Sequence, residues 1–402
     1  MPSSASNSTF LFLEQAEDGV IASGNPQTYR VTGGTLAQTT SSVEDNELRG
    51  DRGRSDTTLV SGSVSGSLDI NWSHKTHDAF LSALLANDPV PVDTNGIKTV
   101  ADMAFNSTTH TISSAGNSLP LIEKGQWVKI AGAASALNNG FYRASTTVAP
   151  TIGAIVVETA VKDVGLTATA AECTISSTRI KQGNDDPLRL FTIERHLEDV
   201  DKIFTWKDVY VGGLSLSFST SDKLSGSFSF MAKSPEVQGD ASLFPGIAGK
   251  LAATTTSPYN TVVGTHVLMD GADMGEGCME SLSLEINANL RERRCLGGGL
   301  SASSIAYDQF SCQCSSSIFF GTAATSALYN KLLTDLPISF SICVTDSAGN
   351  GLAISIPRAK LNSAAVAGGS LGSDILMSAS FDASTDPDLN TLIAFDILGS
   401  TA

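Results

Sequence analysis

Residues 209 to 230 read VYVGGLSLSFSTSDKLSGSFSF, and this stretch decides the fold. Leu214, Leu216 and Phe218 alternate with serines, and Phe228 and Phe230 do the same after a Ser-Asp-Lys turn. A period of two places apolar side chains on one face of a strand and serines on the other. The stretch therefore predicts a β-hairpin with one buried and one polar face.

The rest of the chain has a composition that favours sheets. Charged residues make up 16% and aromatic residues 6% of the 402 residues, whereas Ser, Thr, Gly and Ala dominate, as in β-sheets with many tight turns. Short helices are predicted at Asp78 to Ala86 and at Thr325 to Leu333. The predicted strands are Leu190 to His196, Phe204 to Leu216, Leu224 to Phe230, Ile338 to Thr345, Leu352 to Lys360, and one through Leu376 and Phe381.

An internal repeat is the most informative feature. Leu48-Arg49-x-x-Arg52 recurs as Leu290-Arg291-x-x-Arg294, and Ser65-Gly66-Ser67-Leu68 is matched by Ser315-Ser316-Ser317-Ile318. Each copy continues with a Ser-rich strand, a short helix and three strands, but in the first copy those strands follow only after about a hundred residues. The order predicts one module used twice, with an insertion of domain size in the first copy.

The predicted fold is therefore mainly β, with two tandem β-sandwich or barrel modules, each with a short flanking helix. The insertion has strand patterns of its own and predicts a small β domain. The predicted boundaries are 1–91 and 186–240 for the two parts of the first module, 92–185 for the insertion, 241–275 for a linker and 276–402 for the second module.

No residue pattern supports catalysis, a cofactor or a metal. Gly368-Gly369-Ser370-Leu371-Gly372 matches the nucleophile-elbow pattern, but all five histidines precede Ser370 and the flanking residues predict loop and strand. His74 and His77 are three residues apart, with only Asp78 nearby as a further ligand. Cys312 and Cys314 fall on one face of a strand, and Asp382, Asp386 and Asp388 lack the glycine and distal glutamate of an EF-hand loop.

A long polar segment, Gln38 to Val60, is predicted to be a loop that binds something, because loops of this length are uncommon in compact domains. Both signs of charge are present, so it suits pairing with a copy of itself or a neighbouring subunit, although a solvated loop fits as well. The predicted contact residues are Glu44, Asp45, Glu47, Arg49, Asp51, Arg52, Arg54 and Asp56, and their second-copy counterparts are Arg291, Glu292, Arg293 and Arg294.

The net charge of −16 disfavours a surface that binds phosphates. Two interpretations of this acidity stay open: a conduit surface that a polyanion passes without binding, or simply a charge that keeps the protein soluble. The first ten residues lack a positively charged n-region, and no apolar run reaches the ~18 residues that a membrane helix needs. None of the six cysteines forms a C-x-x-C pair. We expect synthesis in a reducing cytoplasm, with no membrane anchor.

Taken together, these features resemble the major tail tube protein of long-tailed bacteriophages. The resemblance rests on LVSGSVSGSL (59–68), DAFLSALLA (78–86), TIER (192–195), DSAG (346–349) and ISIPR (354–358), and it covers essentially the whole chain except the insertion. It implies a virion protein whose rings stack into a hollow tube for DNA ejection, with inner strands of neighbouring subunits joined into one barrel. The segment Gln38 to Val60 is then the loop that reaches the next ring.

The resemblance also implies partners. They are further copies of the chain, a tape-measure protein, and tail-tip and terminator proteins, with DNA passing through without being bound. If a tube of this kind has six modules around its axis, a chain with two modules forms a trimeric, pseudo-hexameric ring. The insertion is expected to project outward. The alternatives are a tail terminator, a contractile inner tube, or a secreted β-sandwich adhesin or carbohydrate-binding module.

Overall fold

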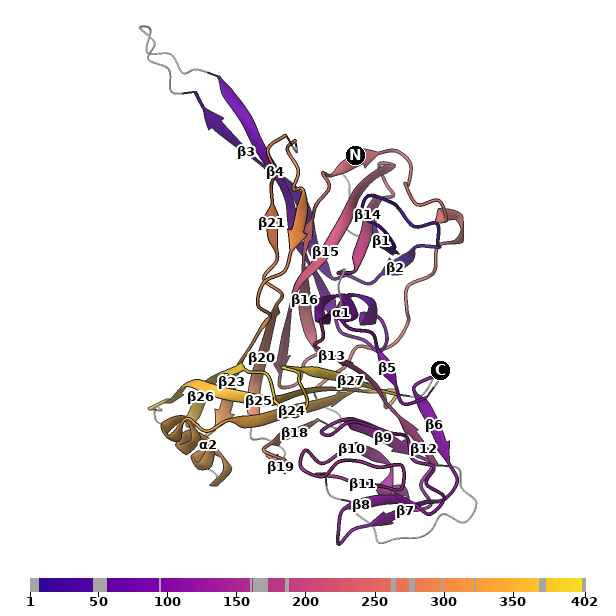
Figure 1. Ribbon diagram of the computed structural model, residues 1–402, viewed down its shortest axis with the longest axis vertical. Coiled ribbons are helices and arrows are strands. Elements are labelled where there is room, and N and C mark those ends of the chain that lie inside the picture. The colour runs from indigo at the N-terminus through magenta and orange to yellow at the C-terminus, as the bar shows by residue number, and fades with distance from the viewer. Residues whose placement is uncertain are drawn as a thin grey trace.

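The computed structural model describes residues 7–45, 56–93, 95–159, 161, 173–184, 188–261, 265–274, 279–297, 299–321, 323–368 and 374–399. The chain is mainly β, as predicted, with long strands in its upper part, a compact group of short strands (β6 to β12) below, and a hairpin that projects far from the body (Figure 1). Two α-helices occur among these residues, α1 (Asp78–Leu85) and α2 (Ala323–Thr334), close to the predicted ranges.

The first run of strands pairs in the order β3–β4–β16–β15–β14–β1. Its helix α1 follows β4, and the short strand β17 lines the free side of β15. The bounds are β1 (Ser8–Gln15), β2 (Gln27–Tyr29), β3 (Gly33–Glu44), β4 (Thr57–Asn71), β14 (Leu190–Leu197), β15 (Lys202–Ser219), β16 (Ser225–Ala232) and β17 (Val237–Gly239).

The second run pairs in the same way, in the order β20–β23–β26–β25–β24–β18, with α2 after β23 and β27 against β25. Every pairing of the first run therefore has a counterpart in the second. The bounds are β18 (His266–Met269), β19 (Ala272–Asp273), β20 (Met279–Asn287), β23 (Ser311–Phe319), β24 (Ile338–Thr345), β25 (Gly351–Val366), β26 (Leu376–Ala383) and β27 (Ala394–Leu398).

Two irregularities recur at matching places in the two runs. The pairing of β15 with β16 skips Gly212, and the pairing of β25 with β26 skips Asn362. A second bulge lies where β15 faces β14, and its counterpart in β25 contains Pro357. A bulge tolerates proline because the ladder needs no amide hydrogen there, and bulges bend the strand that carries them.

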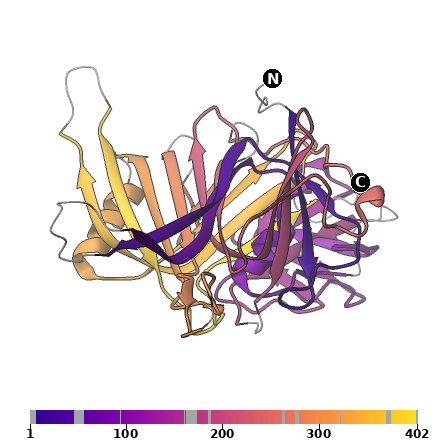
Figure 2. The ribbon, with the colours of Figure 1, turned by 90° about the horizontal axis from the view of Figure 1, so that it is seen from above.

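The two runs join directly. The second half of β15 pairs with β20, from Gly213 opposite Asn287 to Ser219 opposite Ser281. The strands β3, β4, β16, β15, β20, β23, β26 and β25 thus form one continuous sheet. Seen from above, its strands stand side by side as a curved wall, with the yellow β25–β26 hairpin toward one side of the molecule (Figure 2).

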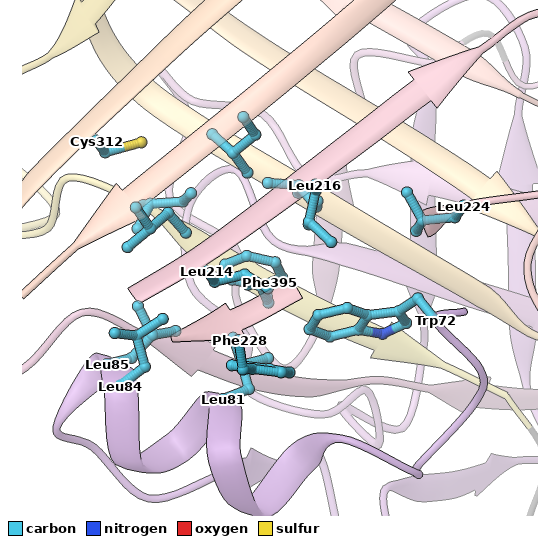
Figure 3. Packing of buried hydrophobic residues seen from close by; sticks show 14 of the residues in the cluster. Trp72, Leu81, Leu84, Leu85, Leu214, Leu216, Leu224, Phe228, Cys312 and Phe395 are labelled. Carbon is cyan, nitrogen blue, oxygen red and sulfur yellow. The ribbon is translucent and has the colours of Figure 1, made fainter. Parts of the chain in front are cut away.

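One hydrophobic core lies behind this wall and contains residues of both runs. Helix α1 packs there because Phe80, Leu81, Leu84 and Leu85 share one side of it and are all buried. Figure 3 shows Leu81, Leu84 and Leu85 below Leu214, Leu216 and Phe228 of the sheet. The helix ends at Leu85 and is capped by Ala86, whose φ of 48° lies in the left-handed region.

The predicted insertion has a core of its own, built from Val100 to Ile175. It consists of a four-stranded sheet in the order β10–β9–β12–β6 and a three-stranded sheet in the order β11–β8–β7. The bounds are β6 (Ile97–Val100), β7 (Met103–Asn106), β8 (Thr111–Ser114), β9 (Trp127–Ala131), β10 (Gly140–Arg143), β11 (Ala154–Val156) and β12 (Cys173–Ser176).

A buried polar cluster docks this insertion. In β13 (Thr178–Lys181), which pairs with β27 and with β5 (Val90–Pro91), Arg179 lies opposite Asp396. The Nε and Nη2 atoms of Arg179 each lie 2.7 Å from the Asp396 carboxylate, which also accepts a hydrogen bond from the amide of Trp127 at 2.9 Å. The indole of Trp127 donates to Ser341 Oγ at 2.6 Å, so the insertion is fixed to strands of the second run.

Three details differ from the sequence predictions. In the predicted loop 38–60 the described residues are mostly strand, because β3 runs to Glu44 and β4 begins at Thr57, and the backbones of the two strands hydrogen-bond to each other although most side chains are polar. The predicted linker 241–275 contains β18, which pairs with β24. The strand β13 lies within the predicted insertion range but pairs with β27, outside the insertion core.

Candidate assembly surfaces

The wall ends in two strands that have one side unpaired in the described part of the chain. Strand β3 pairs only with β4, and the second half of β25, from Leu361 to Val366, pairs only with β26. Both therefore present rows of backbone donors and acceptors. Such edges are templates for pairing with another strand, and they lie at opposite ends of one sheet.

One face of the wall is mainly polar. On its inner strands the alternation that buries Leu214, Leu216 and Phe218 turns serines outward. Two shallow depressions on this face are lined mainly by serines, with Asp69 and Glu285 as the charged residues. No Lys or Arg occurs in β3, β4, β16, β20, β23, β26 or residues 213–219 of β15, so these parts of the face carry only neutral and acidic side chains. Strand β25 does contain Arg358 and Lys360, and Lys360 pairs with Asp382.

The projecting hairpin consists of the outer halves of β3 and β4 (Figure 1). All of its described residues from Gln38 to Asp45 and from Asp56 to Val60 are exposed, including the apolar side chains of Val43, Leu59 and Val60. Of the predicted contact residues, Glu44, Asp45 and Asp56 lie on this hairpin. The predicted residues Glu47, Arg49, Asp51, Arg52 and Arg54 lie outside the described residues, as do Leu48 and the first copy of the L-R-x-x-R motif.

The second-copy residues form a smaller hairpin, β21 (Arg291–Arg293) with β22 (Ser304–Ala306), beside the base of the first (Figure 1). The guanidinium of Arg294 donates to the carbonyl oxygens of Gly62 and Leu300, each at 2.7 Å, and to the Glu292 carboxylate at 2.5 Å. The amide of Gly62 donates to Leu300 O at 2.9 Å. Arg294 thus ties the two hairpins of one chain together, while Arg291 and Arg293 are exposed and Glu292 is half-buried.

The residues considered for other chemistry have structural partners. His77 Nδ1 lies 2.9 Å from Tyr29 Oη and its Nε2 lies 3.3 Å from Asn71 O, while His74 Nδ1 lies 3.0 Å from Tyr259 Oη. Burial lowers the pKa of His77 to about 3 and that of His74 to about 4, so both are neutral at pH 7. No group of three or more His, Cys, Asp or Glu suited to a metal occurs within the described residues.

The cysteine and aspartate candidates named in the sequence analysis also have structural surroundings. Cys312 and Cys314 are buried, unpaired thiols in the hydrophobic core, and Asp386 accepts the amides of Asp388 and Leu389 within a turn. Ser370 and Cys278 lie outside the described residues. No helix in the described ranges is long and apolar enough to cross a membrane.

A family model described as phage tail tube protein matches residues 5–384, nearly the whole chain, and the chain therefore belongs to this family. It is a tail component of a phage virion, and its family is structural. No match was found among curated proteins. Among solved structures it is similar to a phage phi92 endosialidase at 8% identity, with 90% of this chain and 58% of that chain covered and a TM-score of 0.17, which is too low to carry an argument.

Proposed function

We propose that the chain polymerises as stacked rings into the phage tail tube and forms the channel for DNA ejection. The observation that carries this proposal is the wall with an open edge at each end, β3 on one side and the second half of β25 on the other. Joining these edges between copies closes the sheet into a barrel and leaves no edge exposed. A contact between two different surfaces of one chain closes into a ring when the rotation between copies is right.

The repeated strand order, taken with six modules around the axis of such a tube, supports three copies per ring. The two runs of strands have the same pairings and the same bulges, so one chain supplies two similar sectors of a ring. We infer a duplicated module and a trimeric ring of pseudo-hexameric symmetry. The insertion is fixed on the side of the Asp396 cluster and is proposed to project outward, away from the lumen.

The serine-rich face is proposed to line the lumen. Because it lacks Lys and Arg on the strand segments named above, except β25, it offers no cationic row that would exchange places with counterions on DNA. Neutral hydroxyls and the acidic Asp69 and Glu285 let a polyanion pass without being held. DNA therefore passes through the lumen transiently and is not bound there.

Stacking of rings is assigned to the β3–β4 hairpin. It extends beyond the body and exposes Val43, Leu59 and Val60 together with the charges of Glu44, Asp45 and Asp56. An isolated two-stranded hairpin is only marginally stable in water, whereas docking on a neighbouring ring buries the apolar side chains of this hairpin. The tape-measure protein and the tip and terminator proteins are proposed partners inside and at the ends of the tube, after synthesis in the host cytoplasm.

Negative-stain electron microscopy of the purified chain tests this function. We expect long tubes with a central channel, formed spontaneously or on a nucleating tail tip. A variant in which residues 42–59 are replaced by an Asn-Gly turn is expected to form rings or single chains but no tubes, with an unchanged circular dichroism spectrum. Long tubes from this variant would overturn the role of the hairpin, and closed single rings from the unmodified chain would favour a terminator instead.

A further inference from the structure

The pairing at the junction of the two runs within one chain is the template for the contact proposed below between two copies. This inference rests on the proposed function, because it concerns how neighbouring chains join within a ring. The junction pairs the second half of β15 with β20. The two open edges are the counterparts of these strands, since β25 takes the place of β15 and β3 takes that of β20 in the repeated pairing order.

The correspondence can be fixed residue by residue from the bulges. Phe230 and Phe381 lie opposite the residues that immediately precede the skipped Gly212 and Asn362, so they are equivalent. Phe230 pairs with Gly66, which pairs with Leu36. Phe381 pairs with Cys314, which pairs with Leu284. Leu36 of β3 therefore corresponds to Leu284 of β20.

The same bulges align β15 with β25. Gly213 and Ser363 directly follow the skipped residues, and Leu216 and Val366 lie three positions further along. In the junction Leu216 is opposite Leu284, and Ser215 is opposite Glu285. We propose that in the ring β25 of one chain pairs antiparallel with β3 of a second copy, with Val366 opposite Leu36 and Ala365 opposite Ala37.

This seam has less apolar surface than the junction. The junction buries three apolar pairs whose side chains are at most 3% exposed: Leu214 with Ile286, Leu216 with Leu284, and Phe218 with Leu282. Their counterparts at the seam are Ala364 with Gln38, Val366 with Leu36, and Gly368 with Gly34. Only one of these is a pair of large apolar side chains, and Val366 is 39% exposed in the single chain.

Two consequences follow. The free edges of a single chain are poor in apolar side chains, which limits indiscriminate pairing before assembly. The seam depends chiefly on backbone hydrogen bonds and on ring geometry, whereas the junction also has a continuous core. Chains should therefore part at the seam before they open at the junction.

Disulfide cross-linking tests the register. In a Cys278→Ser, Cys295→Ser background, we combine Ala37→Cys with Ala365→Cys, two exposed positions on the polar face. Directly opposite residues in antiparallel strands lie within the Cα separation that a disulfide accepts. The matched control combines Ser41→Cys with Ala365→Cys, a shift of four residues or roughly 13 Å along the strand.

We expect oxidised tubes of the first variant to give covalent dimers and closed trimers on non-reducing gels, with the control giving at most a tenth as much. Tubes that form but cross-link at the control pair, or at neither pair, would overturn the register and leave the proposed function intact. Failure of the unmodified chain to form tubes, even on a nucleating tip, would count against the proposed function itself.

Mild urea tests the strength of the seam. We expect tubes to dissociate into single chains that keep their circular dichroism spectrum and the emission of buried Trp72 and Trp206. Loss of both signals at the same urea concentration as tube dissociation would show that the seam is no weaker than the junction.

Discussion

Replacing Asp396 by Asn is expected to release the insertion from the body of the protein. The Asp396 side chain is fully buried and faces the guanidinium of Arg179, which is 5% exposed. Burial alone would lower the pKa of Arg179, but Asp396 and Glu123 raise it, so the guanidinium stays charged. After the substitution that charge remains buried with Glu123 at 3.4 Å as its remaining acidic partner.

The magnitude follows from the burial of this pair. Removing one partner of a buried ion pair costs about 3–5 kcal/mol, because the other charge stays in a poorly solvated site. Glu123 is 43% exposed and compensates only in part, so we expect about 3 kcal/mol. With an m value of about 3 kcal/mol per molar urea, the midpoint of the affected transition falls by about 1 M.

Urea unfolding followed by tryptophan fluorescence and circular dichroism measures the effect. Trp127 is fully buried at the docking surface and reports on release of the insertion. The control is Asp240→Asn, because Asp240 pairs with Lys202 and its side chain is 76% exposed, where a lost ion pair costs at most about 1 kcal/mol. Equal midpoints for the two variants would refute the assigned role of the Arg179–Asp396 pair.

Three further predictions concern the sheet, the hairpins and pH. Gly66→Ala should destabilise the chain by about 2–4 kcal/mol, because the new Cβ would lie 1.9 Å from the backbone oxygen of Thr35, whereas Gly368→Ala adds a methyl group to open space and should be neutral in thermal unfolding. Arg294→Ala should increase hydrogen exchange at the Gly62 amide by several-fold, an effect that the exposed Arg291→Ala should not reproduce. Burial would raise the pKa of Glu194, but hydrogen bonds from His196, Ser242 and Leu243 outweigh it and hold the pKa below its usual value. This stabilisation is present above the unfolded pKa of about 4.5 and is lost as the pH falls through the folded pKa. Glu194→Gln should therefore lower the free energy of unfolding strongly at pH 7 and less at pH 3. An equal loss at both pH values would contradict the role of the Glu194 carboxylate.

The strands were largely predictable because alternation is a local signal. The predicted range Ile338 to Thr345 agrees with β24, and Asp78 to Ala86 exceeds α1 by one residue. The described strand residues within 38–60 are predicted as loop because most of their side chains are polar and no apolar alternation marks a buried face. Only pairing between β3 and β4 makes them strands, and a pattern of side chains does not report backbone pairing.

The repeat could be recognised in the sequence, but its residue-by-residue alignment could not. The sequence match of Ser65–Leu68 with Ser315–Ile318 is displaced by two residues from the correspondence given by the pairings, which places Gly66 with Cys314. A shift of two residues keeps every side chain on the same face of a strand, so a serine-rich alternation cannot distinguish the two alignments. The Arg179–Asp396 pair, 217 residues apart in the chain, left no local signal at all.

Electron cryomicroscopy of assembled tubes tests the proposed ring most directly. We expect three chains per ring, arranged with pseudo-hexameric symmetry around a lumen lined by the serine-rich face, with β25 of each chain beside β3 of the next. Six full chains in each ring, or a lumen lined by another face of the sheet, would contradict it.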